Sequence, residues 1–82
     1  MFHRVHDVKP LPDLNLLVSF VNNEVKRYDV RPLMDEWEPF RSLGTVPGLF
    51  NCVHVDAGGY GVVWDDNIDL SCNELYNNGI SV

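Results

Sequence analysis

Apolar and polar residues alternate most clearly in the first half of the chain. Apolar side chains recur at every second position from Leu14 to Phe20, and residues 24–30 alternate again after Asn22-Asn23. A period of two places alternate side chains on opposite faces of a strand. Asn also tolerates the positive φ that a two-residue hairpin turn requires. We therefore predict a β-hairpin over residues 14–30, with a two-residue turn at the two asparagines.

A second hairpin is predicted in the C-terminal half. Strand alternation over residues 52–56 leads into Gly58-Gly59, a second apolar run covers residues 60–64, and residues 65–67 form another turn. Glycines beside Val, Tyr and Trp are typical of turns between β-strands that have one buried face. A more irregular alternation over residues 5–10 predicts an additional edge strand that ends at the Pro-Leu-Pro-Asp turn.

The segment between the two hairpins, residues 30–51, excludes long regular elements because it contains three prolines and two glycines. Short helical turns fit better. We expect one from Pro32 to Trp37, and another from Pro39 to Leu43 that ends at Gly44. The apolar side chains of this segment would then form a lid over one sheet face.

A short closing helix is predicted from Ser71. Ser71 and Glu74 have the spacing of a capping box, and Asn77-Asn78-Gly79 ends the helix because Gly accepts the left-handed conformation. The predicted fold class is therefore α+β: a small antiparallel sheet of two β-hairpins, an irregular proline-rich lid with short helical turns, and a short C-terminal helix. We expect residues 1–82 to form a single domain.

Charge narrows the choice of partner. The net charge is −6; residues 1–41 contain all six Lys and Arg and seven acids, whereas residues 42–82 contain five acids and no Lys or Arg. Nucleic-acid binding normally needs clustered cations that displace counterions from phosphates. We therefore expect no direct nucleic-acid binding, and an acidic surface that suits a basic protein partner. The alternative is a solvated surface that only keeps the protein soluble.

Length and apolar content suggest location and assembly. No apolar run has the length of a signal peptide or a membrane span, so we expect a cytoplasmic protein that does not contact membranes. Both cysteines are then expected to be reduced. A domain of 82 residues has a small core, and a homo-oligomer would add to its stability.

One set of polar residues is a candidate for metal binding or catalysis. Alternation would place Cys52, His54 and Asp56 on one face of a single strand, and all three types bind metals. Ligands in a row along a strand lie too far apart to converge on one ion, and the sequence supplies no oxyanion hole for a Cys-His pair. We expect no cofactor, no metal and no enzymatic activity, and keep a metal site or enzyme at these residues as an alternative.

Interaction with a partner is the preferred hypothesis for the remaining candidates. Aromatic residues are enriched at binding hot spots, and Trp37 lies among acids that favour its exposure. Asp65, Asp66 and Asp69 lack the spacing of a calcium loop and are better explained by turns. The candidate interaction residues are Trp37, Asp56, Tyr60, Asp65, Asp66 and Asp69.

Several motifs, taken in order, resemble one family of small bacterial domains, the domain-of-unknown-function 2442 family. The motifs are V-x-x-V-x-P-L-P-D-x-x-L-L-V-x-F (5–20), N-N-E-V-x-x-Y-D-V-x-P-L (22–33), V-x-V-D-x-G-G-Y-G-V-V-W-x-D-x-I-D-L (53–70) and E-L-Y (74–76). The chain differs from the usual family pattern at turns, with Asn23 in place of Gly and Asp65 and Asn67 in place of Pro and Gly. Asn and Asp accept turn conformations, so the same fold is expected.

The resemblance implies a non-catalytic domain, because no catalytic residues are established for the family. Its members are stand-alone or precede a helix-turn-helix domain, and they often neighbour another small protein in a pattern similar to toxin–antitoxin operons. The resemblance therefore favours an antitoxin-like or regulatory member of a two-gene module that binds a protein partner. A transcriptional or nucleic-acid regulator that acts through a partner is the alternative, since no helix-turn-helix motif follows in these 82 residues.

Overall fold

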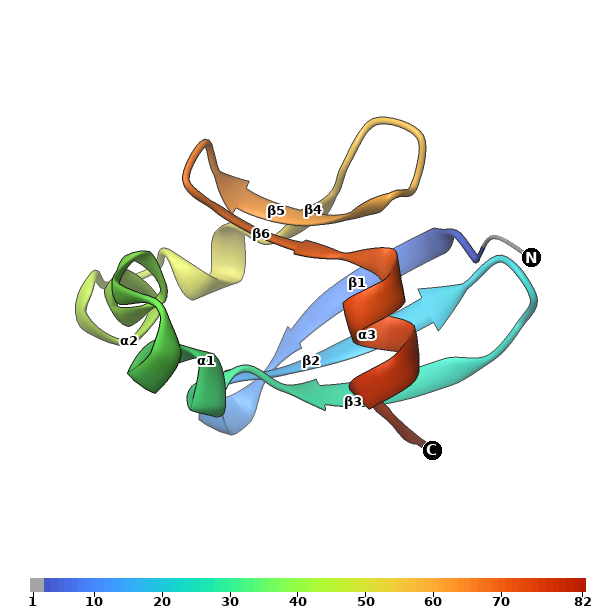
Figure 1. Cartoon of the computed structure of the whole chain (residues 1–82), viewed down its shortest axis with the longest axis horizontal. Coiled ribbons are helices and arrows are strands. Elements are labelled where there is room, and N and C mark those ends of the chain that lie inside the picture. Colours follow the sequence, from blue (N-terminus) through green and yellow to red (C-terminus); the bar gives the residue numbers. More distant parts are fainter. Residues whose placement is uncertain (1–2) are drawn as a thin grey trace.

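The computed structural model describes residues 3–82, in which the strands form two antiparallel sheets (Figure 1). The four-stranded sheet has the order β1-β2-β3-β7, and the three-stranded sheet has the order β4-β5-β6. The strands are β1 (Val5–Leu11), β2 (Asn15–Phe20), β3 (Val25–Asp29), β4 (His54–Val55), β5 (Gly61–Asp65), β6 (Ile68–Ser71) and β7 (Ile80–Ser81). The α+β class is confirmed, but the hairpins lie in two sheets instead of one.

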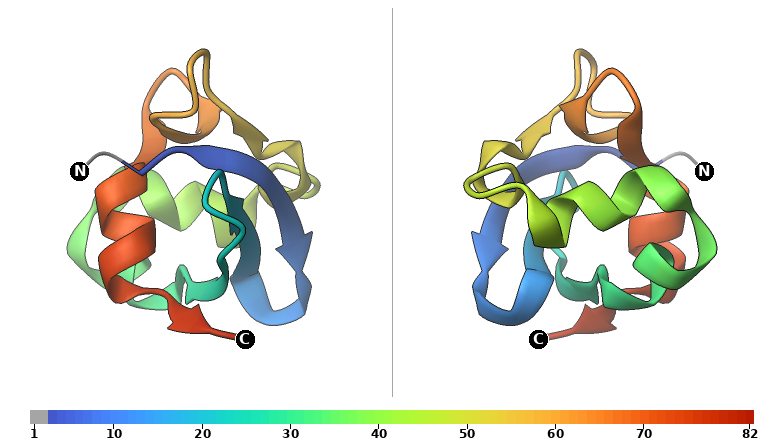
Figure 2. Two further views of the ribbon diagram at one scale, coloured as in Figure 1. Left: turned by 90° about the vertical axis from the view of Figure 1, so that its right-hand side faces the viewer. Right: turned by 90° about the vertical axis from the view of Figure 1, so that its left-hand side faces the viewer.

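Short helical elements connect these strands. The α-helices are α1 (Arg31–Glu36), α2 (Ser42–Thr45) and α3 (Cys72–Asn78), and the 3-10 turns are η1 (Pro12–Leu14), η2 (Glu38–Arg41) and η3 (Phe50–Cys52). The end-on views of Figure 2 show the helices on the open side of the curved four-stranded sheet, and Figure 1 shows the segment from α1 to α2 and helix α3 toward opposite ends of the molecule. Within residues 3–82, every helix is too short or too polar to cross a lipid bilayer.

The four-stranded sheet follows the predicted alternation. Leu16, Val18 and Phe20 of β2 are buried on its inner face, and β1 is the edge strand expected from its irregular pattern. The predicted two-residue turn is wrong, because the N–H of Asn23 donates to Phe20 O and the N–H of Phe20 donates to Glu24 O, both at 2.9 Å. The loop therefore has three residues, with Asn23 left-handed at φ 73°.

The strand predicted over residues 52–56 is mostly absent, since β4 contains only His54 and Val55. Tertiary contacts explain the difference. The N–H of Cys52 donates to Leu49 O at 2.9 Å, and the indole N–H of Trp64 donates to Phe50 O at 3.1 Å. These bonds hold the preceding residues in the η3 turn, so the ladder begins late.

Two glycines allow close backbone approaches, one between the two sheets and one within the three-stranded sheet. Gly59 has φ 77°, and a Cβ there would lie 2.8 Å from the backbone oxygen of Val5 in β1. A Cβ at Gly61 would lie 2.2 Å from the backbone oxygen of Leu70 in β6. Any larger residue at Gly61 would therefore separate β5 from β6.

The predicted lid is present, with two changes. Leu33, Phe40 and Leu43 are buried, as expected for a cover over the core. The second helical turn does not end at Gly44, because the N–H of Val46 donates to Ser42 O at 2.9 Å and extends α2 to Thr45. A Cβ at Gly44 would lie 2.6 Å from the Met34 methyl group, so this position is small because of packing.

Helix α3 starts as predicted but ends differently. The N–H of Glu74 donates to the Ser71 side chain at 3.1 Å, whereas the Glu74 carboxylate accepts the Tyr28 hydroxyl at 2.7 Å and so connects α3 to β3. Gly79 ends the helix at φ −73°, so the predicted left-handed conformation is wrong. The close approach of Leu75 O, 2.5 Å from where a Cβ would lie, explains this glycine.

A single hydrophobic core lies between the two sheets and the helical segments. Eighteen residues make it up: Val5, Val8, Leu16, Val18, Phe20, Tyr28, Val30, Leu33, Phe40, Leu43, Phe50, Val53, Val62, Trp64, Ile68, Leu70, Cys72 and Leu75. Both sheets contribute to this set, so neither hairpin buries its apolar face without the other.

Candidate interaction surface

An acidic hollow lies where the helical segment meets the turn between β5 and β6. Its volume is about 510 Å³, and it is lined by Glu38, Pro39, Ser42, Asp65, Asn67 and Ile68. Two of these side chains are carboxylates and none is cationic. Two carboxylates with no cation among the lining residues give the hollow a negative potential, which attracts a basic group.

Local structure fixes the two acids. Asp65 ends β5, and its Oδ1 accepts the N–H of Asn67 at 2.8 Å, which closes the turn. Glu38 begins η2 directly before Pro39. Because the turn and η2 come from different parts of the chain, only the tertiary fold brings these carboxylates to one hollow.

Trp37 directly precedes Glu38 of the acidic hollow and is an exposed aromatic residue, although it does not line the hollow itself. Its side chain is 54% exposed, which agrees with the exposure predicted from its acidic neighbours. Its ring centroid lies 5.7 Å from that of Phe40, which in turn lies 6.1 Å from Trp64 in the core. The indole is therefore supported from beneath while one side stays open to a partner.

The six predicted interaction residues do not form one surface. Trp37, Asp65 and Asp66 belong to the end with the acidic hollow, and Asp69 is exposed on β6. Asp56 and Tyr60 lie in the β4–β5 loop, at the opposite end of the three-stranded sheet (Figure 1).

Asp56 and Tyr60 have a local structural role in that loop. Asp56 Oδ1 accepts the N–H of Tyr60 at 2.7 Å, and the Tyr60 ring lies 5.7 Å from the Arg4 guanidinium carbon. Glu38 is not among the interaction residues predicted from the sequence. Its position beside an exposed Trp was the available signal.

The alignment predicted for Cys52, His54 and Asp56 is wrong. Cys52 lies in η3 with its thiol directed to Gly48 O at 3.5 Å, and the Nδ1 atom of His54 lies 3.1 Å from Cys52 O. Within residues 3–82, no three His, Cys, Asp or Glu side chains converge in a way that could hold a metal ion. The three side chains therefore do not share one face of a strand.

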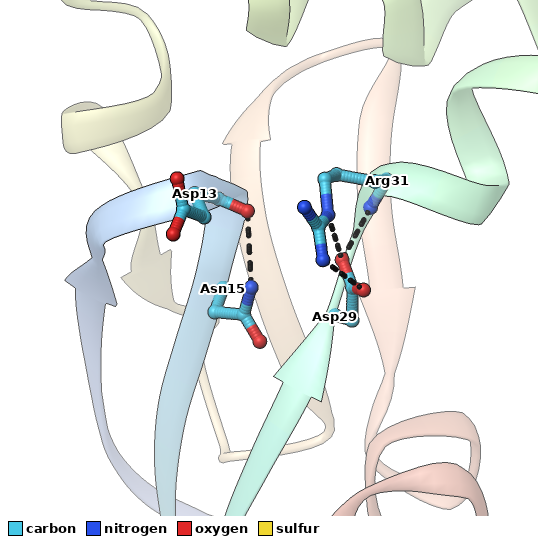
Figure 3. Close-up of polar contacts among 4 residues, drawn as sticks. All are labelled: Asp13, Asn15, Asp29 and Arg31. Carbon is cyan, nitrogen blue, oxygen red and sulfur yellow. Dashed lines mark hydrogen bonds and ion pairs between the residues drawn. The ribbon is translucent and has the colours of Figure 1, made fainter.

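A second hollow, of about 400 Å³, lies at one end of β2 and β3 (Figure 3). We call it the charge-balanced hollow; it is lined by Leu11, Pro12, Asp13, Asn15, Arg27, Asp29, Arg31 and Ile80. Asn15 Nδ2 donates to Asp13 O at 3.0 Å. The Asp29 carboxylate accepts Arg31 Nε at 3.0 Å and Nη2 at 2.9 Å, and it also accepts the backbone N–H of Arg31.

Charge compensation distinguishes this second hollow. The hydrogen bond from Arg31 lowers the pKa of Asp29, and the same contact raises the pKa of the Arg31 guanidinium. Two arginines face two aspartates here, so the formal charges cancel. A phosphate group would meet both carboxylates as well as the guanidinium groups, which makes the hollow a poor site for nucleic acid.

A further polar cluster joins α3 to the β2–β3 hairpin. The Tyr76 hydroxyl donates to Glu24, and Lys26 Nζ donates to Tyr76 O at 2.6 Å. The hydrogen bond from Tyr76 lowers the pKa of Glu24. Burial, followed by the Glu74 hydrogen bond, raises the pKa of Tyr28. These groups hold the helix against the sheet and are already paired within the chain.

Comparison with solved structures supports the fold. The chain is similar to a Nitrosomonas europaea protein whose crystal structure is described as that of a "Putative DNA Binding Protein", with a TM-score of 0.78 and 21% sequence identity. The similarity covers 93% of this chain and 48% of the other, so this chain spans about half the length of that protein. Comparison with curated proteins finds no match.

The family is established by a match over nearly the whole chain. Residues 5–81, which run from the first residue of β1 to the last residue of β7, match the model described as "Protein of unknown function (DUF2442)". The chain belongs to the DUF2442 family, as its motifs indicated.

Proposed function

We propose that this chain is a non-catalytic interaction domain that binds a basic protein partner at the acidic hollow and the adjoining indole of Trp37. The observation that carries the proposal is that Glu38 and Asp65 line one hollow with no cation among its lining residues. The charge-balanced hollow is of similar size, but its lining contains two arginines, one of which pairs with Asp29, so its formal charges cancel.

The expected energetics fit a modest, salt-sensitive interface. A Lys or Arg of a partner would gain two carboxylate contacts in the acidic hollow, and the exposed indole supplies an aromatic anchor. Charges at a partly open site are screened as ionic strength rises, because the Debye length is about 8 Å at physiological salt. Affinity should therefore fall as salt is added.

An antitoxin-like or regulatory role in a bacterial two-gene module is the most concrete form of this proposal. It rests on the family resemblance, and the acidic hollow gives such a role a binding surface. A basic small protein encoded beside this chain would be the partner.

The test compares two charge-matched double variants in co-purification with the product of the adjacent gene. Glu38→Gln with Asp65→Asn removes two charges from the acidic hollow and keeps the side-chain shapes. Asp13→Asn with Asp29→Asn removes two charges from the charge-balanced hollow. We expect about a tenfold loss of affinity or more in the first variant only, since each charge-assisted contact contributes about 1.5–3 kcal/mol.

Equal losses in both variants would show that only net charge matters and would contradict the proposed surface. Failure of the unmodified chain to bind at low salt would contradict the proposed partner. Thermal unfolding of both variants controls for loss of structure.

A nucleic-acid regulator that acts through a partner or an attached domain is the second candidate. The support is the name of the Nitrosomonas europaea protein, of which this chain matches about half. We expect the chain to shift its own promoter DNA only when the partner is present. A shift by the chain alone would favour direct contact instead.

A further inference from the structure

The free edge of β6 is adjacent to the acidic hollow. In the order β4-β5-β6, this strand pairs with β5 on one side and has no strand on the other. Ile68, the first residue of β6, also lines the acidic hollow. A chain that followed this edge would therefore pass directly into the hollow.

The register shows which backbone groups of β6 point outward. The N–H of Cys72 donates to Tyr60 O at 2.7 Å, and Ser71 pairs with Gly61 and Asp69 with Val63. Bonded and non-bonded pairs alternate along an antiparallel ladder. Ser71 and Asp69 therefore occupy the non-bonded positions toward β5, so their N–H groups and the Asp69 C=O point away from that strand.

These outward groups remain available to a ligand. Among residues 3–82, the N–H groups of Asp69 and Ser71 and the C=O of Asp69 have no hydrogen-bond partner beyond the sheet. Asp69 is exposed, whereas Ile68 and Leu70 are 2% and 4% exposed and anchor the strand in the core. The strand is thus anchored in the core while Asp69 on it stays exposed.

The edges of the four-stranded sheet, at β7 and β1, are less suited to the addition of a strand. In β7 the N–H of Val82 donates to Val25 O, so by the same alternation only Ser81 directs backbone groups outward within this two-residue strand. At the opposite end of that sheet, β1 contains Pro10, and it lies beside β4. Proline and coverage both discourage strand addition.

We propose that an extended, basic segment of the partner adds to the free edge of β6 as a fourth strand and places a Lys or Arg in the acidic hollow. This inference rests on the proposed function and specifies its binding mode. Main-chain hydrogen bonds to Asp69 and Ser71 would supply sequence-independent affinity. The carboxylates of Glu38, Asp65 and Asp69 would select positive charge.

The test uses an acetylated and amidated heptapeptide of alternating Lys and Val as the probe, with alternating Glu and Val as the control peptide. We expect the amide hydrogens of Asp69 and Ser71 to exchange more slowly when the basic peptide is bound. The acidic peptide should leave them unchanged.

A pair of variants separates the backbone contact from the charge. Asp69→Pro removes the outward N–H from an edge position where proline is tolerated, and Asp69→Asn removes only the charge. We expect Asp69→Pro to bind the basic peptide about tenfold more weakly than Asp69→Asn, because the first variant loses an added main-chain bond. Circular dichroism of both variants checks that the sheet is retained.

The outcomes separate this inference from the proposed function. Equal affinity of the two Asp69 variants, or no binding at millimolar basic peptide, would overturn strand addition. A loss of partner binding in the Glu38→Gln, Asp65→Asn variant would still support the acidic hollow in that case. If neither the hollow nor the edge variants changed partner binding, both proposals would fail.

Discussion

The two sheets differ in whether the acidic side chains around them are paired within the chain. Around the four-stranded sheet two acids have partners within the chain: Asp29 pairs with Arg31, and Glu24 accepts the Tyr76 hydroxyl. Around the acidic end of the three-stranded sheet, Glu38 and Asp65 line a hollow without a cation. Acids that are already paired within the chain stabilise the fold, whereas acids without a partner cation are available to bind another molecule.

The same contrast holds for the two tryptophans. Trp64 of β5 is 4% exposed and its indole N–H donates to Phe50 O. Trp37 is 54% exposed beside the acidic hollow. One ring therefore supports the fold of the three-stranded sheet, and the other stays exposed, as the proposed binding surface requires. Three predictions test this division, from the largest expected effect to the smallest.

The largest effect is expected from replacing the two tryptophans separately. Trp64→Ala should lower the free energy of unfolding by about 3–5 kcal/mol, because it leaves a core cavity and an unpaired Phe50 carbonyl. Trp37→Ala should cost less than about 1 kcal/mol of stability. Urea unfolding followed by circular dichroism measures both values. Equal stability losses would contradict the division between a core ring and a binding ring.

A smaller effect is expected from two glycine substitutions. Gly61→Ala should destabilise by about 2–4 kcal/mol, since its Cβ would overlap the Leu70 carbonyl and separate β5 from β6. Gly48→Ala has a positive φ but no neighbour within 4 Å, so we expect a cost of about 1 kcal/mol. Thermal unfolding compares the two. A milder effect at Gly61 would show that the three-stranded sheet adjusts more easily than its packing indicates.

The smallest effect concerns acid pH and the four-stranded sheet. The pKa of Glu24 is lowered in the folded chain, first by the Tyr76 hydrogen bond. The stabilisation is therefore complete above the ordinary Glu pKa of 4.5 and is lost as pH falls through the lower folded value. Glu24→Gln should thus lower the melting temperature slightly at pH 7 and much less at pH 3. Tyr76→Phe should show the same trend, and a constant difference across pH would contradict this assignment.

Local patterns identified the elements whose shape depends on near neighbours. The alternation from Leu14 to Phe20 predicted β2 and its buried face, and Ser71 predicted the start of α3. Trp37 was expected to be exposed because of its acidic neighbours, and it is. These features follow from period-two burial, capping and local charge, all of which act within a few residues.

Errors arose where distant residues decide the backbone. The strand predicted over residues 52–56 is reduced to His54–Val55, and Cys52 belongs to η3, because Trp64 binds the Phe50 carbonyl from another part of the chain. Gly79 has an ordinary φ, and the residue is glycine because a Cβ there would lie 2.5 Å from Leu75 O and 3.0 Å from the Cβ of Lys26 in β3. In both cases the sequence shows which residues are present, but it does not show the contacts that they make in the folded chain.

The sequence by itself determined the α+β class, the family, the buried face of β2 and the excess of acid. Only the tertiary structure decided that the hairpins belong to two sheets, that Asp56 and Tyr60 lie away from Trp37, and that Glu38 and Asp65 line the same hollow. The physical reason is the distance along the chain over which each effect acts. Periodicity and capping depend on neighbours along the chain, whereas a hollow between η2 and the β5–β6 turn depends on how a shared core packs distant segments together.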